Sequence, residues 1–350
     1  MKFLITILIF TAGLFSCKSN QQSESNTEIE APVTDSTTIN SVVKKHQLPA
    51  IVLHGGAGWI TKESMQNGLE QQYKNALDSA ITIGYILLDS GASALVAVEK
   101  TINYLENHPL FNAGKGAVLN AEGNAELDAS IMDGSNLNAG GVAGVKTVKN
   151  PISLARMVKD STKHVLLCRD GAEDFAVKMK LEPMEPEYFI TPKTREAREK
   201  RIKNLHKMGT VGCVAIDVNG NIAAGTSTGG MDKKQFGRIG DSPLIGAGTY
   251  ANNKTCGVSC TGHGEYFIKN AVAYDLSAQI EYLGKTAPEA ANQIIHRKLA
   301  QQDAKGGLIA LDKNGNVAIS FNTPGMFWAY KVKGNTTLLG MYKSDVLPKN

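Results

Sequence analysis

Residues 209–230 read GTVGCVAIDVNGNIAAGTSTGG, and this stretch gives the strongest local indication of the fold. Apolar residues lie on both sides of the dipeptide Asn219-Gly220. Short apolar runs bounded by turn residues are typical of buried strands. Asn-Gly tolerates the positive φ angles of a type I′ turn. The stretch therefore predicts an antiparallel β-hairpin with this turn at its tip.

The same pattern returns later in the chain, where IALDKNGNVA at 309–318 parallels VAIDVNGNIA at 214–223. Two helices are expected between the two hairpins, one over 264–282 and one starting at Thr286, which has capping-box spacing to Glu289. Hairpins rather than strand–helix–strand crossovers dominate this half. This order predicts antiparallel sheets covered by helices, in a layered α+β or αββα arrangement.

The first half adds a buried strand at 50–53 and a glycine loop at 54–58. Apolar residues at helical spacing predict helices over 69–88 and 95–105. Asn150-Pro151 is expected to open a third helix, since proline suits the first helical position. Residues 181–208 hold three prolines and many charges. We expect them to be exposed and dispensable.

The composition is that of an ordinary globular protein, with 350 residues, 42% hydrophobic and 20% charged. Much of the net charge of +4 comes from residues 193–207, which carry seven Lys or Arg against two Glu. A nucleic-acid partner is not expected, because its footprint would spread basic residues over a folded face. Cysteines form no CxxC pair, so neither a metal site nor an obligatory disulfide is expected, and Cys168 and Cys213 are predicted to be buried in strands.

Residues 1–17 have the pattern of an export signal. Lys2 precedes an apolar run at 3–15, which is too short to span a bilayer comfortably. The run ends in Leu-Phe-Ser-Cys, which resembles a bacterial lipobox with Cys17 as the lipidated residue. We therefore expect a lipoprotein signal at 1–17, a polar spacer at 18–47 and a location on the cell envelope. An ordinary signal peptide with a chance cysteine is the alternative.

Glycine, threonine, arginine and aspartate are concentrated between residues 209 and 264. The motifs are GTVG at 209–212, TSTGG at 226–230, GRIGDSP at 237–243 and TGHGE at 261–265, preceded by HGGAG at 54–58, FNAGKG at 111–116 and ELDASIMDG at 126–134. In this order and spacing they resemble the plant-type L-asparaginase/isoaspartyl peptidase family of N-terminal-nucleophile hydrolases. The resemblance runs from about residue 49 to the C-terminus.

The resemblance implies an αββα four-layer sandwich and a precursor that cleaves its own Gly209–Thr210 bond. One domain, 48–350, would then become an α chain (about 48–209) and a β chain (210–350), assembled as an (αβ)₂ heterotetramer. The chemistry is consistent with this. A threonine hydroxyl needs a neighbouring base, and a freed α-amine titrating near pH ~8 supplies one. Without the other motifs, Thr210 would be an ordinary threonine at the start of a strand.

The family's site residues carry over by motif position. Thr228 would tune the nucleophile, Arg238 would bind the substrate α-carboxylate, and Asp241 would bind its α-ammonium. Thr261 and Gly262 would form the oxyanion hole and contact the substrate, Gly264 would contact the substrate amine, and Asn112 would lie near the scissile bond. On spacing alone, Thr228 would bond to backbone and Arg238 would pair with Asp241 on the surface. His263 is expected to be structural.

The resemblance also extends to a loop that wraps a sodium or potassium ion in main-chain carbonyls. No cofactor is expected for catalysis. The loop residues are Leu105, Glu106, His108, Phe111, Ala113 and Lys115.

The expected activity is hydrolysis of β-aspartyl dipeptides and of the L-asparagine side-chain amide through a threonyl acyl-enzyme. A glycosylasparaginase shares the mechanism, but Gly209 and Gly229 favour the asparaginase branch. A protein-cleaving threonine aspartase is a weaker alternative. A non-catalytic, lipid-anchored binding protein is the alternative from another class, although it would have no need of the Thr210 hydroxyl.

Overall fold

The structure, a computed structural model, describes residues 48–192, 194–196 and 209–346, all within one compact unit. The predicted signal with Cys17, the spacer at 18–47 and most of the basic run at 193–207 lie outside the described residues. Within the described ranges, no helix combines the length and the apolar character that a membrane crossing requires.

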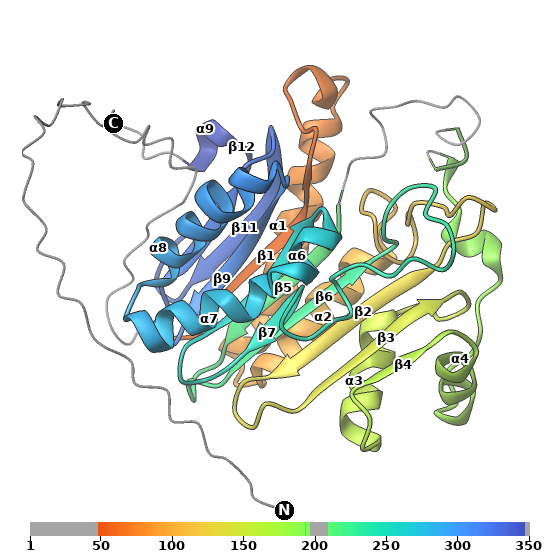
Figure 1. The fold of residues 1–350 in the computed structure, drawn as a ribbon, viewed down its shortest axis with the longest axis horizontal. Helices are drawn as coiled ribbons and strands as arrows, with labels where there is room; N and C mark the ends of the chain where they lie inside the picture. The colour runs from red at the N-terminus through yellow and green to blue at the C-terminus, as the bar shows by residue number, and fades with distance from the viewer. Residues whose placement is uncertain (1–47, 193, 197–208, 347–350) are drawn as a thin grey trace, which may run out of the picture. The chain divides into compact units, whose positions relative to one another are not determined.

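Two sheets form the centre of the fold (Figure 1). The larger sheet contains β1 (Ala50–Gly58), β2 (Leu127–Asp133), β3 (Ala139–Val145), β4 (Leu166–Cys168), β5 (Val211–Ile216), β6 (Ile222–Thr228), β11 (Gly325–Val332) and β12 (Leu338–Tyr342). The smaller sheet contains β7 (Thr249–Ala251), β8 (Cys256–Gly262), β9 (Gly306–Asp312) and β10 (Val317–Phe321). Their strand orders are β12-β11-β1-β5-β6-β2-β3-β4 and β10-β9-β8-β7.

Helices cover the outer face of each sheet. The helices in the described part of the chain are α1 (Leu69–Asp89), α2 (Ala94–Asn107), α3 (Pro151–Ser161), α4 (Arg169–Lys178), α6 (Gly264–Lys269), α7 (Val272–Leu283), α8 (Ala287–Asn292) and α9 (Lys343–Val346). Short 3-10 or π turns add η1 (Glu63–Met65), η2 (Pro186–Phe189), η3 (Gln293–Leu299) and η4 (Ala300–Gln302). Helices α1, α2 and α3 pack on the larger sheet, and α7 and α8 pack on the smaller one.

The core alternates along each central strand, as a sheet buried on both faces requires. Ile51 and Leu53 of β1 pack against the helices, whereas Val52 packs between the sheets. The layers are therefore helix, sheet, sheet and helix. This order confirms the predicted αββα sandwich.

Both predicted hairpins form, but their turns differ from the prediction. β5 pairs with β6, and β9 pairs with β10, each antiparallel. Only the glycines of the two loops, Gly220 and Gly315, have positive φ angles, so neither turn is type I′. Instead the Asp217 carboxylate accepts hydrogen bonds from the backbone of Asn219 and Asn221. The Asp217 side chain therefore closes a loop that is longer than a two-residue turn. The Asn-Gly pair alone does not indicate this longer loop.

Three further predictions need correction. The helix expected over 264–282 is split into α6 and α7, because Ala271 has φ 46° in the left-handed region. Phe189, in the stretch expected to be exposed and dispensable, is fully buried, and its carbonyl accepts a hydrogen bond from Gly116 N. Cys168 is exposed rather than buried, because β4 lies at the edge of the larger sheet.

Candidate active site

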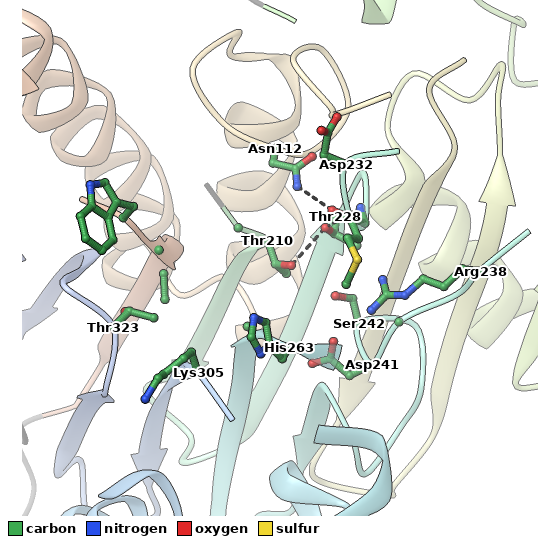
Figure 2. A pocket seen from close by; sticks show the side chains of 18 of the residues that line it. Asn112, Thr210, Thr228, Asp232, Arg238, Asp241, Ser242, His263, Lys305 and Thr323 are labelled. Atoms are coloured by element: carbon green, nitrogen blue, oxygen red, sulfur yellow. Dashed lines mark hydrogen bonds between the residues drawn. The ribbon is translucent and has the colours of Figure 1, made fainter. Parts of the chain in front are cut away.

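Thr210 lies directly before β5, beside a cavity of about 680 Å³ (Figure 2). The residue is nearly buried, and its hydroxyl donates a hydrogen bond of 3.0 Å to the hydroxyl of Thr228. Thr228 is the last residue of β6, the antiparallel neighbour of β5, and Val211 lies opposite Ser227. The strand ladder therefore sets the position of the Thr210 hydroxyl.

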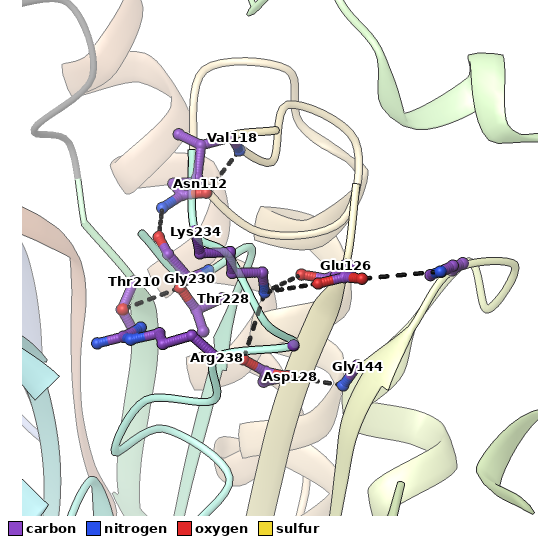
Figure 3. Close-up of polar contacts among 12 residues, drawn as sticks. Asn112, Val118, Glu126, Asp128, Gly144, Thr210, Thr228, Gly230, Lys234 and Arg238 are labelled. Carbon is purple, nitrogen blue, oxygen red and sulfur yellow. Dashed lines mark hydrogen bonds and ion pairs between the residues drawn. The ribbon is translucent and has the colours of Figure 1, made fainter. Parts of the chain in front are cut away.

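Thr228 is itself held by the turn that follows β6 (Figure 3). Its hydroxyl also accepts a hydrogen bond of 2.9 Å from Gly230 N. Asn112 donates from Nδ2 to Gly230 O at 2.9 Å, and its Oδ1 accepts from Val118 N at 2.8 Å. Asn112 lines the cavity, but these bonds use its side-chain amide to brace the turn. Asn112 therefore lies beside Thr228, and its place near the scissile bond stays a prediction.

Glycines allow the backbone to approach the Gly209–Thr210 peptide closely. Gly56 has φ +105°, and a Cβ at this position would come within 2.2 Å of the Gly209 carbonyl oxygen. A Cβ on Gly209 would lie 2.5 Å from the Thr261 hydroxyl. Any larger residue at either position would clash. The HGGAG motif thus packs directly against the peptide that was predicted to be cleaved.

Thr261 and Gly262 end strand β8 near this peptide. Thr261 is fully buried, and its hydroxyl accepts a bond of 3.3 Å from Ala57 N. Gly262 lines the cavity and has φ +148°, and a Cβ there would lie 2.6 Å from Gly306 Cα. The two residues predicted to form the oxyanion hole are thus beside Gly209 and Thr210.

Arg238 and Asp241 line the same cavity as Gly209, and they do not form the surface ion pair that spacing alone would suggest. Within the described chain, Arg238 instead pairs with Glu265 through two hydrogen bonds, Nε to Oε1 at 2.9 Å and Nη2 to Oε2 at 3.0 Å. The guanidinium holds the pKa of Glu265 below its usual range. Glu265 is part of the TGHGE motif, yet nothing in its spacing identifies Arg238 as its partner.

Asp241 is a buried carboxyl group that faces the cavity. The residue is 4% exposed, and its Oδ2 has no hydrogen-bond partner within the described chain. Burial raises the pKa of Asp241 to about 7, against smaller opposing effects of its own backbone and Arg238. A Cβ on Gly264 would lie 2.8 Å from both Arg238 Nη2 and Asp241 Oδ1, so only glycine lets the two side chains converge there. The arrangement suits a ligand that carries both a carboxylate and an ammonium group.

A buried cluster beneath Arg238 was not predicted from the sequence. Lys234 has 1% side-chain exposure, and its Nζ donates to Glu126 O at 2.8 Å (Figure 3). The same Nζ lies 3.9 Å from carboxylate oxygens of Glu126 and Asp128. Burial lowers the pKa of Lys234, and the two carboxylates oppose this effect. The cluster ties the loop that carries Arg238 to strand β2.

The predicted cation loop begins in the last turn of α2 and continues beyond it. A Cβ on Gly114 would lie 2.4 Å from Glu106 O, and one on Gly116 would lie 2.6 Å from Pro109 O and 2.8 Å from Phe111 O. Carbonyl oxygens are thus gathered along this turn, and oxygen ligands suit hard cations. Among the described residues, no group of three His, Cys, Asp or Glu side chains is placed to hold a metal ion.

Comparison with known proteins finds similarity over most of the chain. The asparaginase family model matches residues 47–340. The isoaspartyl peptidase of Escherichia coli is 45% identical over 307 residues, covering 84% of this chain and 96% of that protein. A probable isoaspartyl peptidase/L-asparaginase 2 of Arabidopsis thaliana is 43% identical over 79% of this chain and 94% of its own length. The human isoaspartyl peptidase/L-asparaginase is 42% identical, with coverages of 80% and 92%.

The predicted location, anchored to the cell envelope through Cys17, is wrong on these comparisons. The matched region covers 96% of the E. coli protein and 98% of the Salmonella typhimurium isoaspartyl peptidase, so these relatives have almost no length left for an anchoring segment. The prediction rested on a short local pattern at residues 3–17, which lie outside the described residues. An apolar run that ends in cysteine carries little information compared with a match over most of the chain.

The Lys234 cluster gives a stability prediction. Lys234→Met leaves the buried carboxylate of Asp128 without its cation, and removing one partner of a buried ion pair costs about 3–5 kcal/mol. The free energy of unfolding in urea, measured in a Thr210→Ala background so that every chain stays intact, is expected to fall by this amount. Lys233→Met is the matched control, because Lys233 is exposed. Equal stability of the two variants would contradict the structural role of Lys234.

Proposed function

The chain belongs to the asparaginase family and is a hydrolase of the N-terminal-nucleophile type, and we propose that it hydrolyses β-aspartyl dipeptides and the side-chain amide of L-asparagine. The observation that carries the proposal is the Thr210 hydroxyl, which follows Gly209, bonds Thr228 at 3.0 Å and shares a cavity with Arg238 and Asp241. The names of the relatives, isoaspartyl peptidase and L-asparaginase, support the same substrates.

Self-cleavage comes first in the proposed mechanism. Thr210 Oγ attacks the carbonyl carbon of Gly209, and the peptide nitrogen takes up the proton. The C–N bond breaks, leaving an ester between Gly209 and Thr210 Oγ. Water hydrolyses this ester, which frees the α-amine and the hydroxyl of Thr210. The close approach of Gly56 to the Gly209 carbonyl supports a role for this strand in holding the peptide for attack.

Turnover repeats the chemistry on the substrate. The Thr210 amine accepts the hydroxyl proton while Oγ attacks the substrate side-chain carbonyl. Donors near Thr261 and Gly262 stabilise the developing oxyanion. The leaving nitrogen takes the proton and departs as ammonia or as an amino acid. Water then hydrolyses the acyl-enzyme and releases aspartate. Thr228, which accepts the Thr210 hydrogen bond, orients the nucleophile throughout.

Substrate recognition is assigned to two opposite charges. Arg238 binds the α-carboxylate through guanidinium N–H groups, with Glu265 holding the side chain in place. The unpartnered Oδ2 of Asp241 accepts a hydrogen bond from the α-ammonium group of the substrate. Gly264, which lies between the two side chains, contacts the substrate amine. Desolvation of Asp241 is offset only when a cation binds, so the site favours zwitterionic substrates.

Two further features belong to the proposal. A sodium or potassium ion would be held by carbonyl groups of the cation loop and would stabilise the turn that presents Asn112. Its donors would come from Leu105, Glu106, His108, Phe111, Ala113 and Lys115. The cleaved chains, about 48–209 and 210–350, are proposed to assemble as an (αβ)₂ heterotetramer, with the family resemblance as support.

The proposal predicts that Thr210→Ala remains a single chain and hydrolyses neither a β-aspartyl dipeptide nor L-asparagine, because the attacking hydroxyl is gone. Thr210→Ser keeps a hydroxyl and is the matched control, expected to self-cleave. Denaturing gels and an assay for released amino acid or ammonia measure both properties. Cleavage of Thr210→Ala before residue 210, or full activity of an uncut chain, would refute the mechanism.

The pKa of Asp241 gives a pH prediction. Asp241 must be ionised to bind the α-ammonium group, and it loses its charge as the pH falls through about 7. The Thr210 amine, titrating near pH ~8, must also be deprotonated. Log kcat/KM is therefore expected to rise with a slope of about two below pH 7 and about one just above it. In Asp241→Asn, only the slope of about one should remain at lower overall activity. A slope of about two in Asp241→Asn would mean that a group other than Asp241 causes the loss of activity below pH 7.

A further inference from the structure

The cavity extends past Thr210 on the side away from the proposed aspartyl site. In Figure 2, Arg238 and Asp241 lie on one side of Thr210, whereas Lys305 and Thr323 lie on the other. At about 680 Å³, the cavity is within the range of roughly 300–1,000 Å³ that drug-sized ligands occupy. L-Asparagine, a single amino acid that releases only ammonia, leaves this second side empty.

The second side is a wall built where strands of both sheets begin or end. Gly58 of β1 pairs with Gly325 of β11, so Trp59 and Pro324, the next residues outward, are neighbours. Asn322 and Gly306 exchange two hydrogen bonds, Gly306 N to Asn322 Oδ1 at 2.9 Å and Asn322 N to Gly306 O at 3.0 Å. Lys305 immediately precedes Gly306. The wall thus combines an indole, a proline ring and a lysine.

Lys305 is fixed at its backbone, whereas its charged end is held only by an exposed ion pair. Its carbonyl accepts a hydrogen bond of 3.0 Å from His263 N, which ties it to the loop after Gly262. Its ammonium group pairs with Asp303 at 3.0 Å, but the two side chains are 50% and 91% exposed. Exposed ion pairs contribute little to stability. Asp303 does not line the cavity, so Lys305 can exchange this partner for a carboxylate within it.

A β-aspartyl dipeptide carries a carboxylate in the corresponding place. Its aspartyl α-groups lie on one side of the scissile amide, and the second residue, with its own carboxylate, lies on the other. With the aspartyl groups at Arg238 and Asp241 and the scissile carbonyl at Thr210, the second residue must occupy the wall that contains Lys305.

We propose that this wall is a binding site for the leaving residue, in which Lys305 binds the carboxylate of the second amino acid and Trp59 and Pro324 contact its side chain. The inference rests on the proposed function and narrows the range of its substrates. The preferred substrates are dipeptides with a free C-terminal carboxylate and an apolar second residue.

The test compares β-aspartyl-leucine, its C-terminal amide and L-asparagine on the self-cleaved enzyme. The acid is expected to exceed the amide in kcat/KM by about fivefold, the upper end for an exposed ion pair, mainly through a lower KM. Lys305→Met keeps the aliphatic stem and should bring this ratio to about one, whereas Lys305→Arg should preserve it. L-Asparagine, which lacks the second carboxylate, should be affected less than the dipeptide acid.

Lys313→Met is the matched control. Lys313 immediately follows β9, whereas Lys305 immediately precedes it, and seven residues of strand at about 3.3 Å each place the two lysines about 20 Å or more apart. This variant should keep the wild-type ratio. Equal rates for acid and amide in the wild type, or an unchanged ratio in Lys305→Met, would overturn the inference. The comparison of the dipeptide acid with its amide on the wild-type enzyme tests the inference even if Lys305→Met fails to self-cleave. Failure of the self-cleaved enzyme on all three substrates would instead overturn the proposed function.

Discussion

The hydrogen bond of 3.0 Å between the hydroxyls of Thr210 and Thr228 is the contact on which the rest of the site depends. It exists because β5 and β6 pair antiparallel, which brings the start of one strand beside the end of the other. The turn after β6 then fixes Thr228 through Gly230, and Asn112 fixes Gly230. A nucleophile directly before a central strand of the larger sheet, with its hydroxyl bonded to the neighbouring strand, has little freedom to leave its position.

The charges around this nucleophile are arranged at different depths. Asp241 is buried with an unpartnered oxygen, whereas Arg238 is held at the cavity wall by Glu265. Below them, Lys234 neutralises carboxylates on and beside β2, and it anchors the loop that carries Arg238. The buried charges give the aspartyl site its rigidity, because moving one would leave another unpaired. The exposed Lys305 lies at the opposite side, where a variable leaving residue needs an adaptable partner.

Local patterns in the sequence predicted the layers, both hairpins, the first three helices and the capping box at Thr286, because each depends on residues that are close in the chain. The motif resemblance brought Thr210, Thr228, Arg238 and Asp241 into one site. The features that were missed depend on contacts between distant segments. Glu265 pairs with a residue 27 positions away, and Lys234 reaches Glu126 across 108 positions. The anchor prediction was wrong because it relied on a short local pattern alone.

Self-cleavage before Thr210 can be read from the mass and the N-terminal sequence of the purified wild-type protein. After incubation at neutral pH, two chains are expected, one of which begins Thr-Val-Gly-Cys at Thr210. This result would mean that the free amine exists and that the intact peptide beside Gly56 is the precursor state. A single uncut chain that nevertheless hydrolyses β-aspartyl dipeptides would rule out the proposed mechanism, because the α-amine of Thr210 that serves as its catalytic base would not have been formed.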